Sequence, residues 1–165
     1  MRIGILSDTH NNTRNTEAAL EYFRGAGVTR LFHCGDITGA NIVLRFAGFD
    51  VTFVQGNGDY AHDEIVTAML MIGGRRTLPA RWSGTVAGKR IGVTHGDSYG
   101  VLYDLARGGR HDYVFHGHTH RRRDETIGAA RVINPGALGG KRDGARSVAV
   151  VDLAKGAVEF VEIAP

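Results

Sequence analysis

Short apolar runs that end in polar, glycine-rich turns recur along this chain, and they constrain its fold more than any other feature. In the first half, strand-like runs alternate with segments whose apolar residues recur at helical spacing. The strand-like runs are residues 2–7, 30–34 and 51–54, and the helix-like segments are residues 13–27, 41–47 and 62–74. Alternating strands and helices are typical of a parallel sheet, so the first half predicts an α/β arrangement.

The second half differs because it is mostly strand-like. We expect strands at residues 85–88, 89–95, 112–117, 130–136, 147–153 and 157–163, and one helix at about residues 99–109. No proline-rich or low-complexity linker separates the two halves. The sequence therefore predicts a single domain over residues 1–165, built as an α/β (α+β) sandwich.

Composition and hydropathy favour a globular protein without a membrane segment. Hydrophobic residues make up 42% and charged residues 22% of the chain, which is ordinary for a soluble domain. No apolar run approaches the roughly 20 residues of a spanning helix, and the opening stretch MRIGILSDTH reaches an acid and a histidine too early for a signal peptide. We expect a cytoplasmic location, no membrane partner and, for the single cysteine Cys34, a buried structural thiol. The oligomeric state stays open.

The charge balance alone does not indicate a nucleic-acid partner. The chain has 20 lysines and arginines against 17 acidic residues, a formal charge of +3. One dense basic run, Arg121–Arg123, directly follows a pair of histidines. This run could hold an anionic substrate, and because of it a nucleic-acid partner is not excluded.

Seven polar side chains come just after the predicted strands. They are Asp8, His10, Asp36, Asn57, His95, His118 and His120. Ligand sites in α/β sheets lie beyond the carboxyl ends of the strands, so we expect these side chains to meet in one cleft. His118 and His120 are two positions apart, and in an extended segment they would leave the same face.

This set of side chains suits two divalent transition-metal ions. Two aspartates, four histidines and one amide supply N and O ligands. By contrast, no serine or cysteine is accompanied by a residue that would orient it as the nucleophile of a covalent hydrolase. Such ligands accept Mn²⁺, Ni²⁺, Fe²⁺ or Zn²⁺, and Mn²⁺ is our first expectation. One carboxylate has to bridge the ions, and Asp36 is the expected bridge because it is central in the order of ligands.

The same residues resemble the five ordered motifs of the calcineurin-like metallophosphoesterases. The motifs are Asp8-Thr9-His10, Gly35-Asp36, Gly56-Asn57, His95-Gly96 and Gly117-His118-Thr119-His120. The similarity runs from residue 3 to about residue 140 and includes the turn Asn134-Pro135-Gly136, as in small bacterial and archaeal phosphodiesterases of that superfamily. It implies two packed mixed β-sheets flanked by helices, with two metals at their top edge.

The resemblance also implies roles for the ligands. Asp8, His10, Asp36 and His120 would surround one metal, and Asp36, Asn57, His95 and His118 the other. Asp36, Asn57 and His95 would serve catalysis, and Asn57, Gly58 and Arg121 would lie near the phosphate of a small phosphate-ester substrate. Two cations lower the pKa of a bridging water, so the expected reaction is in-line attack of hydroxide on phosphorus, with no covalent enzyme intermediate.

The third motif departs from the pattern of many phosphomonoesterases, which have a histidine after Gly-Asn. Here Gly58 and Asp59 follow Asn57, so the usual histidine acid is absent, and Asp97 stands where many small relatives have histidine. We hypothesise that Gly58 leaves room for a second substituent on the phosphate, which favours phosphodiesters. A nucleotide or protein phosphatase, a nuclease and a non-catalytic metal-binding scaffold are the alternatives.

The remaining histidines carry no motif. His33, His62, His111 and His116 are therefore expected to be surface or packing residues.

Overall fold

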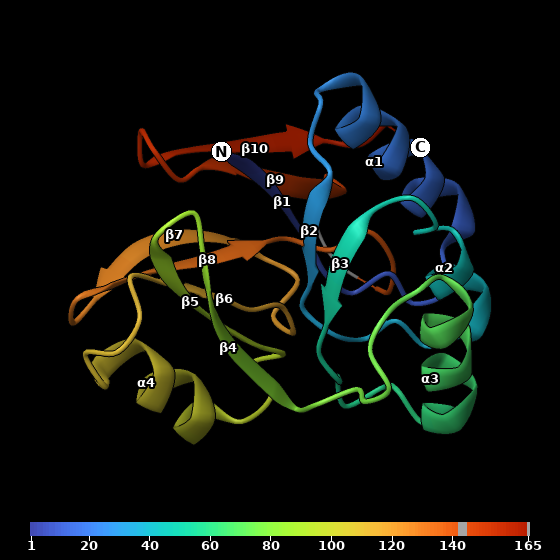
Figure 1. Ribbon diagram of the computed structural model, residues 1–165, viewed down its shortest axis with the longest axis horizontal. Coiled ribbons are helices and arrows are strands. Elements are labelled where there is room, and N and C mark those ends of the chain that lie inside the picture. Colours follow the sequence, from blue (N-terminus) through green and yellow to red (C-terminus); the bar gives the residue numbers. More distant parts are fainter. Residues whose placement is uncertain (142–144, 165) are drawn as a thin grey trace.

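The computed structural model describes residues 1–141 and 145–164, which form two five-stranded sheets and four helices (Figure 1). The first sheet has the order β10-β9-β1-β2-β3, with β1 (Arg2–Leu6), β2 (Arg30–His33), β3 (Asp50–Phe53), β9 (Ser147–Asp152) and β10 (Ala157–Glu162). The second has the order β4-β5-β6-β8-β7, with β4 (Arg81–Val86), β5 (Lys89–Thr94), β6 (Tyr113–Phe115), β7 (Arg122–Ile127) and β8 (Ala130–Pro135). The helices are α1 (Thr13–Gly25), α2 (Ala40–Leu44), α3 (His62–Met71) and α4 (Tyr99–Arg107).

Each sheet mixes parallel and antiparallel pairs. In the first sheet β1, β2 and β3 are parallel, and β9 is antiparallel to both β1 and β10. In the second sheet β5, β6 and β8 are parallel, and β4 and β7 add antiparallel strands at the two edges. The predicted fold of two mixed sheets flanked by helices is therefore confirmed.

The two sheets pack face to face over one apolar layer. Ile5 and Phe32 of the first sheet share this layer with Val93 and Phe115 of the second, and all four are fully buried. The Phe32 and Phe115 ring centroids are 5.5 Å apart. Burying side chains of this size stabilises the fold by about 1.5–3 kcal/mol each, so this layer fixes how the strand ends of the two sheets meet.

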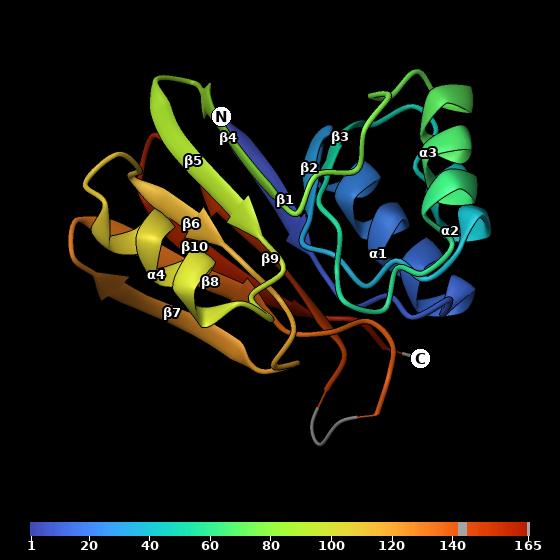
Figure 2. The ribbon, with the colours of Figure 1, turned by 90° about the horizontal axis from the view of Figure 1, so that it is seen from below.

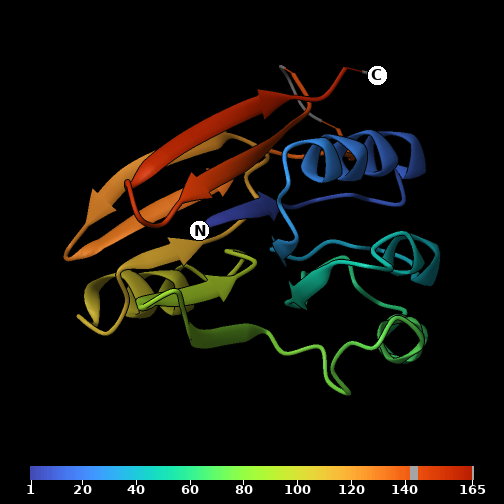
Figure 3. The same cartoon turned by 45° about the horizontal axis from the view of Figure 1, so that its top comes forward.

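Helices cover the outer faces of the sandwich. Helices α1, α2 and α3 lie together beside the first sheet, and α4 lies on the second (Figures 2 and 3). Helix α1 begins after Asn12, whose side-chain oxygen accepts a hydrogen bond from the Asn15 N–H at 3.0 Å. Its buried face carries Ala19, Leu20 and Phe23 at helical spacing, which explains why this segment is a helix.

The largest differences from the predicted elements lie in the second sheet. Strand β4 begins at Arg81 and ends at Val86, so residues 87–88, expected to be strand, form the turn to β5, with φ of 48° at Ala87 and 77° at Gly88. Strand β7, RRDETI, was not predicted, because none of its residues is buried and its sequence has no apolar alternation. Within the described residues, no helix is both long and apolar enough to cross a membrane.

Candidate metal centre

Strands of both sheets end at one edge of the molecule, and the predicted ligands lie just beyond these ends. Strands β1, β2 and β3 are parallel, as are β5 and β6, so within each group the following loops emerge on the same side. The residues that follow these strands are Asp8 and His10, Asp36, Asn57, His95, and His118 with His120. His95 Nδ1 lies 2.8 Å from the Cys34 carbonyl oxygen, so the strand ends of the two sheets meet here.

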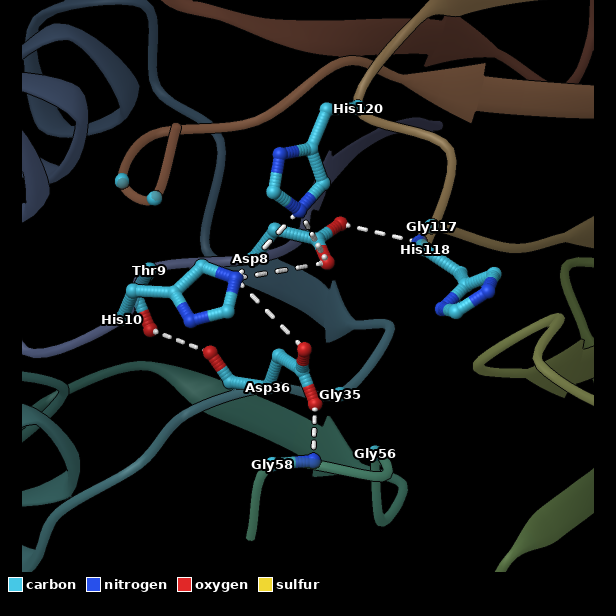
Figure 4. A network of polar contacts seen from close by, with 12 residues as sticks. Asp8, Thr9, His10, Gly35, Asp36, Gly56, Gly58, Gly117, His118 and His120 are labelled. Carbon is cyan, nitrogen blue, oxygen red and sulfur yellow. Dashed lines mark hydrogen bonds and ion pairs between the residues drawn. The ribbon is translucent and has the colours of Figure 1, made fainter. Parts of the chain in front are cut away.

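Asp8, His10 and His120 form a first cluster of converging donor atoms. The Nε2 atoms of His10 and His120 are 3.3 Å apart. Asp8 Oδ1 lies 3.2 Å from His120 Nε2 and 3.9 Å from His10 Nε2. Asp36 Oδ2 approaches His10 Nε2 to 3.5 Å. Figure 4 shows these four side chains facing one another, so their N and O atoms are aimed at a common position.

Asp8, Asp36 and His95 form a second cluster. His95 Nε2 lies 3.5 Å from Asp36 Oδ1 and 3.1 Å from Asn57 Oδ1. The two oxygens of Asp36 thus face one histidine in each cluster, and Asp8 takes part in both clusters. Both carboxylates lie between the clusters, whereas the sequence analysis expected only Asp36 to be shared by the two metals.

His118 stands beside the second cluster rather than within it. Its ring meets the His95 ring edge-on, with centroids 5.1 Å apart. Its backbone N–H donates to Asp8 Oδ2 at 3.1 Å, which helps to fix that carboxylate. In Figure 4 its ring lies to one side of the His10 and His120 pair.

Many of the predicted ligands have a left-handed backbone. The φ angle is 53° at Asp8, 44° at His10, 54° at Asp36, 66° at His118 and 56° at His120. Sparsely populated backbone conformations cost of order 1–3 kcal/mol each and persist only where the surrounding structure imposes them. Strain concentrated at one edge in this way is typical of a functional site.

Asp59 organises two of the loops that carry these ligands. Its buried carboxylate accepts hydrogen bonds from the N–H groups of Gly56 at 2.8 Å, Asp36 at 3.1 Å and Thr38 at 2.7 Å. Burial raises the pKa of Asp59, and the backbone donors limit that rise. The Gly58 N–H of the same turn donates to Asp36 Oδ1 at 2.7 Å, which orients the Asp36 carboxylate.

A buried pair, Thr9 and His33, ties the first two ligand loops together. His33 Nδ1 accepts a hydrogen bond from the Gly35 N–H at 3.2 Å, so its other nitrogen carries the proton and donates to Thr9 Oγ1 at 3.1 Å. The Thr9 hydroxyl lies 3.3 Å from the carbonyl oxygen of Asp36. Burial lowers the pKa of His33 to about 3, which keeps the ring neutral.

The electrostatics of the cluster favour positive charge. Burial acts to raise the pKa of Asp36, but the hydrogen bond and charge of His95, together with the Gly58 N–H, outweigh it and lower that pKa to about 2. Burial acts to lower the pKa of His95, but Asp36 and Asp8 outweigh it and raise that pKa to about 9. The pKa of His120 is raised chiefly by its contact with Asp8. The two carboxylates therefore create a negative potential that stabilises cations.

A family profile, described as the calcineurin-like phosphoesterase superfamily domain, matches residues 1–156 of this chain. The chain belongs to this superfamily.

Two further comparisons agree with this assignment. The phosphoesterase is 29% identical over 157 residues to phosphodiesterase MJ0936 of Methanocaldococcus jannaschii, an alignment that covers 94% of the chain and 95% of that relative. The solved structure of an archaeal phosphodiesterase superposes with a TM-score of 0.89 at 28% identity, covering 98% of the chain and 99% of that structure. The fold is shared with the Escherichia coli phosphoesterase YfcE, with a TM-score of 0.73, 22% identity and coverage of 99% and 100% of the two chains.

The residues of this phosphoesterase fit divalent metal ions. Asp8 Oδ1 is buried between two histidines and has no hydrogen-bond partner in the described part of the chain. His120 Nδ1 lies 3.0 Å from the Lys141 carbonyl oxygen, and His95 Nδ1 lies 2.8 Å from that of Cys34. A histidine that donates from Nδ1 to a carbonyl has its Nε2 turned toward the cluster, and once Nε2 has lost its proton its lone pair can bind a metal, which is how metal-binding histidines are commonly oriented.

Two glycines allow other loops to approach these ligands closely. A Cβ atom at Gly117 would lie 1.8 Å from Ser7 Oγ and 2.5 Å from Asp8 Oδ2. A Cβ atom at Gly140, where φ is 67°, would lie 2.8 Å from His10 Cδ2 and 2.8 Å from His120 Cε1. A side chain at either position would push on a ligand of the first cluster.

Sequence reasoning did not find the residues that hold the loops. Asp59 could have been noticed, because an aspartate after Gly-Asn-Gly can accept backbone N–H groups of the same turn. His33 gave no signal, since it lies inside a run of apolar residues. Asn134 was noted only as part of a turn, but its side-chain amide donates to the Gly117 carbonyl at 2.7 Å and so supports the loop that bears His118.

The remaining histidines lie outside both clusters. The His62 side chain is about half exposed at the start of α3. His111 is buried between Ser83 Oγ, at 2.9 Å, and the Leu105 carbonyl oxygen, at 3.0 Å. His116 is buried, and its pKa is lowered to about 4, mainly by burial.

The basic run after His120 is only partly in strand β7, because Arg121 precedes the strand and Arg122 and Arg123 are its first two residues. Arg122 pairs with Glu162 at 2.9 Å, and Arg123 pairs with Glu125 on its own strand. Arg121 is exposed and has no carboxylate within ion-pair distance among the described residues. The three arginines therefore do not act as one cationic cluster.

Proposed function

We propose that this phosphoesterase is a phosphodiesterase with a dinuclear metal centre. One ion would be held by Asp8, His10, Asp36 and His120, and the other by Asp36, Asn57, His95 and His118. The observation that carries this proposal is the position of Asp36, whose two oxygens each lie 3.5 Å from a histidine nitrogen on either side. A carboxylate in that position can reduce the repulsion between two cations.

Two bound divalent cations supply Lewis-acid stabilisation of the phosphate oxygens and a water of lowered pKa. The side chains of this chain position the substrate around them. Asn57 faces His95 with Oδ1, at 3.1 Å, so its amide nitrogen is available to donate to a phosphate oxygen. Arg121, exposed next to His120, adds positive charge for the substrate anion.

The missing side chain at residue 58 favours a diester. A Cβ atom at Gly58 would lie 3.0 Å from Asp36 Oδ1 and 3.3 Å from Thr38 Cγ2, so a larger residue here would need these neighbours to shift slightly. The Gly58 N–H already donates to Asp36, so the contribution of this residue to the substrate is space rather than a hydrogen bond. The phosphodiesterase names of the M. jannaschii relative and of the archaeal structure support the same substrate class.

The direct test is hydrolysis of a chromogenic phosphodiester by chelator-treated protein, with Mn²⁺, Ni²⁺, Zn²⁺, Fe²⁺, Mg²⁺ or no ion restored. We expect turnover to return with transition metals and to be highest with Mn²⁺. Asp36→Asn should lower that turnover by roughly several orders of magnitude while the protein stays folded, because the shared carboxylate is lost. Near-normal turnover by folded, metal-free Asp36→Asn protein would contradict the two-metal proposal.

The diester preference is tested by Gly58→His, assayed on paired model mono- and diesters. We expect the ratio of diester to monoester kcat/KM to fall. Gly58→Ala is the matched control, because it adds the same crowding of Asp36 without an imidazole. If the ratio is the same in Gly58→His and Gly58→Ala, residue 58 does not select the substrate.

Several finer expectations belong to this proposal. We infer one domain over residues 1–165, supported by the family match over residues 1–156, and a cytoplasmic enzyme that acts on a small phosphate ester. Assays with mononucleotides, phosphopeptides and single-stranded DNA test the phosphatase and nuclease alternatives. Binding of two ions without turnover on any phosphate ester would instead support a metal-binding scaffold.

A further inference from the structure

A cavity lies away from the two metal clusters, where the open edges of the two sheets face each other. Strand β3 ends the first sheet and β4 ends the second, and the segment that joins α3 to β4 crosses between them (Figure 1). The cavity has a volume of about 490 Å³ and shares no residue with either metal cluster. Its size is in the range of pockets that hold small ligands, about 300–1,000 Å³.

Two guanidinium groups line this cavity. Arg30 is nearly buried and donates to Asp50 Oδ1 at 2.8 Å and to Thr52 Oγ1 at 2.7 Å. Arg75 comes from the joining segment, and within residues 1–141 and 145–164 no carboxylate lies in ion-pair distance of it. Two positive groups against one carboxylate leave the cavity with an excess of positive charge.

The only tryptophan of the chain, Trp82, forms an aromatic wall between these arginines. Its ring is partly exposed, and its centroid lies 6.0 Å from Arg30 Cζ and 5.9 Å from Arg75 Cζ. The indole extends across Gly84, where a Cβ atom would lie 2.4 Å from Trp82 Cζ2. Glycine at that position therefore allows the ring to lie along β4.

The contact of Arg75 with the indole is weak enough to be exchanged. An exposed cation–π contact is weaker than a hydrogen bond to a charged group. An anion entering the cavity can therefore draw the Arg75 guanidinium away from the ring, which leaves the face of Trp82 open for stacking.

The edge of β3 adds backbone donors. The N–H groups of Asp50 and Val54 point toward β2, where they donate to the carbonyls of Thr29 and His33. Successive residues of a strand alternate, so the N–H groups of Val51 and Phe53 point to the open side, which lines the cavity. Backbone N–H groups beside guanidinium groups are suited to phosphate oxygens.

We propose that this cavity binds an anion that carries an aromatic ring, of the class of a nucleoside monophosphate. The base stacks on Trp82, and the phosphate is held by Arg75, by Arg30 and by the free edge of β3. Because the cavity is separate from the metal clusters, binding here is independent of the metal ions.

The test is the fluorescence of Trp82, which reports on this cavity alone because the chain has one tryptophan. Titration of the full chain with adenosine monophosphate should give a saturable change, unaltered by excess chelator. Arg75→Ala should weaken the affinity about tenfold or more, the equivalent of losing one charge-assisted hydrogen bond. Arg76→Ala, the neighbouring arginine outside the cavity, should bind as the unmodified protein does.

Three further results separate the contributions. Adenosine alone and inorganic phosphate alone should each bind about tenfold or more weakly than the nucleotide, since each makes only part of the contacts. Gly84→Ala, which displaces the indole and keeps both arginines, should weaken the nucleotide but not phosphate. The proposal is overturned by the absence of a saturable change, by equal effects of Arg75→Ala and Arg76→Ala, or by loss of the signal with chelator.

Discussion

His33 should make this protein less stable in mild acid, although the residue is far from the surface. Its ring is completely buried between Phe46 and Phe53, with centroids 5.9 Å and 5.7 Å away, and burial lowers its pKa from 6.5 to about 3. The folded state therefore resists protonation of His33 between these two pH values, whereas the unfolded state accepts it. The contribution of His33 to stability is complete above pH 6.5 and is lost as the pH falls below that value.

The size of the effect follows from linkage. At about pH 5, the unfolded chain gains close to a full proton at this residue, and the loss of stability relative to about pH 8 is ~2 kcal/mol, or about 30-fold in the unfolding equilibrium. At that pH the folded form remains almost entirely neutral, so the result depends on the unfolded pKa more than on the folded one.

The measurement is urea denaturation of the unmodified protein and of His33→Asn at both pH values, with chelator present in all samples. Asn can accept from the Gly35 N–H as His33 Nδ1 does, but it does not titrate. We expect His33→Asn to be less stable at both pH values and to lose about 2 kcal/mol less than the unmodified protein between them. His62→Asn is the matched control, because that side chain lies outside the core and is about half exposed, and it should follow the unmodified protein. If all three proteins show the same pH dependence, the assignment of a neutral, tightly buried His33 is wrong.

Three other substitutions test the packing around the site and the core. Asp59→Asn should lower the free energy of unfolding by about 2–4 kcal/mol, because an amide cannot accept all of the backbone N–H groups that this carboxylate holds. Urea denaturation measures this change, and an unchanged midpoint would contradict the role given to Asp59. Gly117→Ala should weaken Mn²⁺ binding about tenfold or more in calorimetry, since the new Cβ would lie 1.8 Å from Ser7 Oγ and 2.5 Å from the ligand atom Asp8 Oδ2. Unchanged affinity would show that this close approach is not needed. Gly4→Ala should destabilise the protein by about 1–3 kcal/mol, because a Cβ atom in this strand of the first sheet would lie 2.5 Å from Leu31 Cδ2. A thermal unfolding midpoint equal to that of the unmodified protein would show that the core adapts without loss of stability.

The alternation of apolar runs and polar turns was enough to predict the strands and helices of the first sheet. Its central strands β1, β2 and β9 are buried on both faces and read as apolar runs, whereas the edge strand β10 is marked by alternating residues. The same reasoning failed for β7, since an edge strand that faces solvent needs no apolar pattern. It also misplaced β4, in which exposed residues alternate with half-buried ones. None of its residues is fully buried, so the apolar pattern of the strand is weak.

The sequence by itself determined which donor atoms are present and that they follow the ends of strands, because residue type and the position of each strand along the chain are local properties. Only the tertiary structure decided how these atoms are aimed. The left-handed backbone at Asp8 and Asp36 is held by hydrogen bonds from distant loops, and the neutral state of His33 follows from its complete burial. The cavity beside Trp82 is likewise formed by two edges that belong to different sheets. Conformations that are unfavourable for an isolated segment persist here because the packed sandwich imposes them, and no pattern within one segment can reveal that constraint.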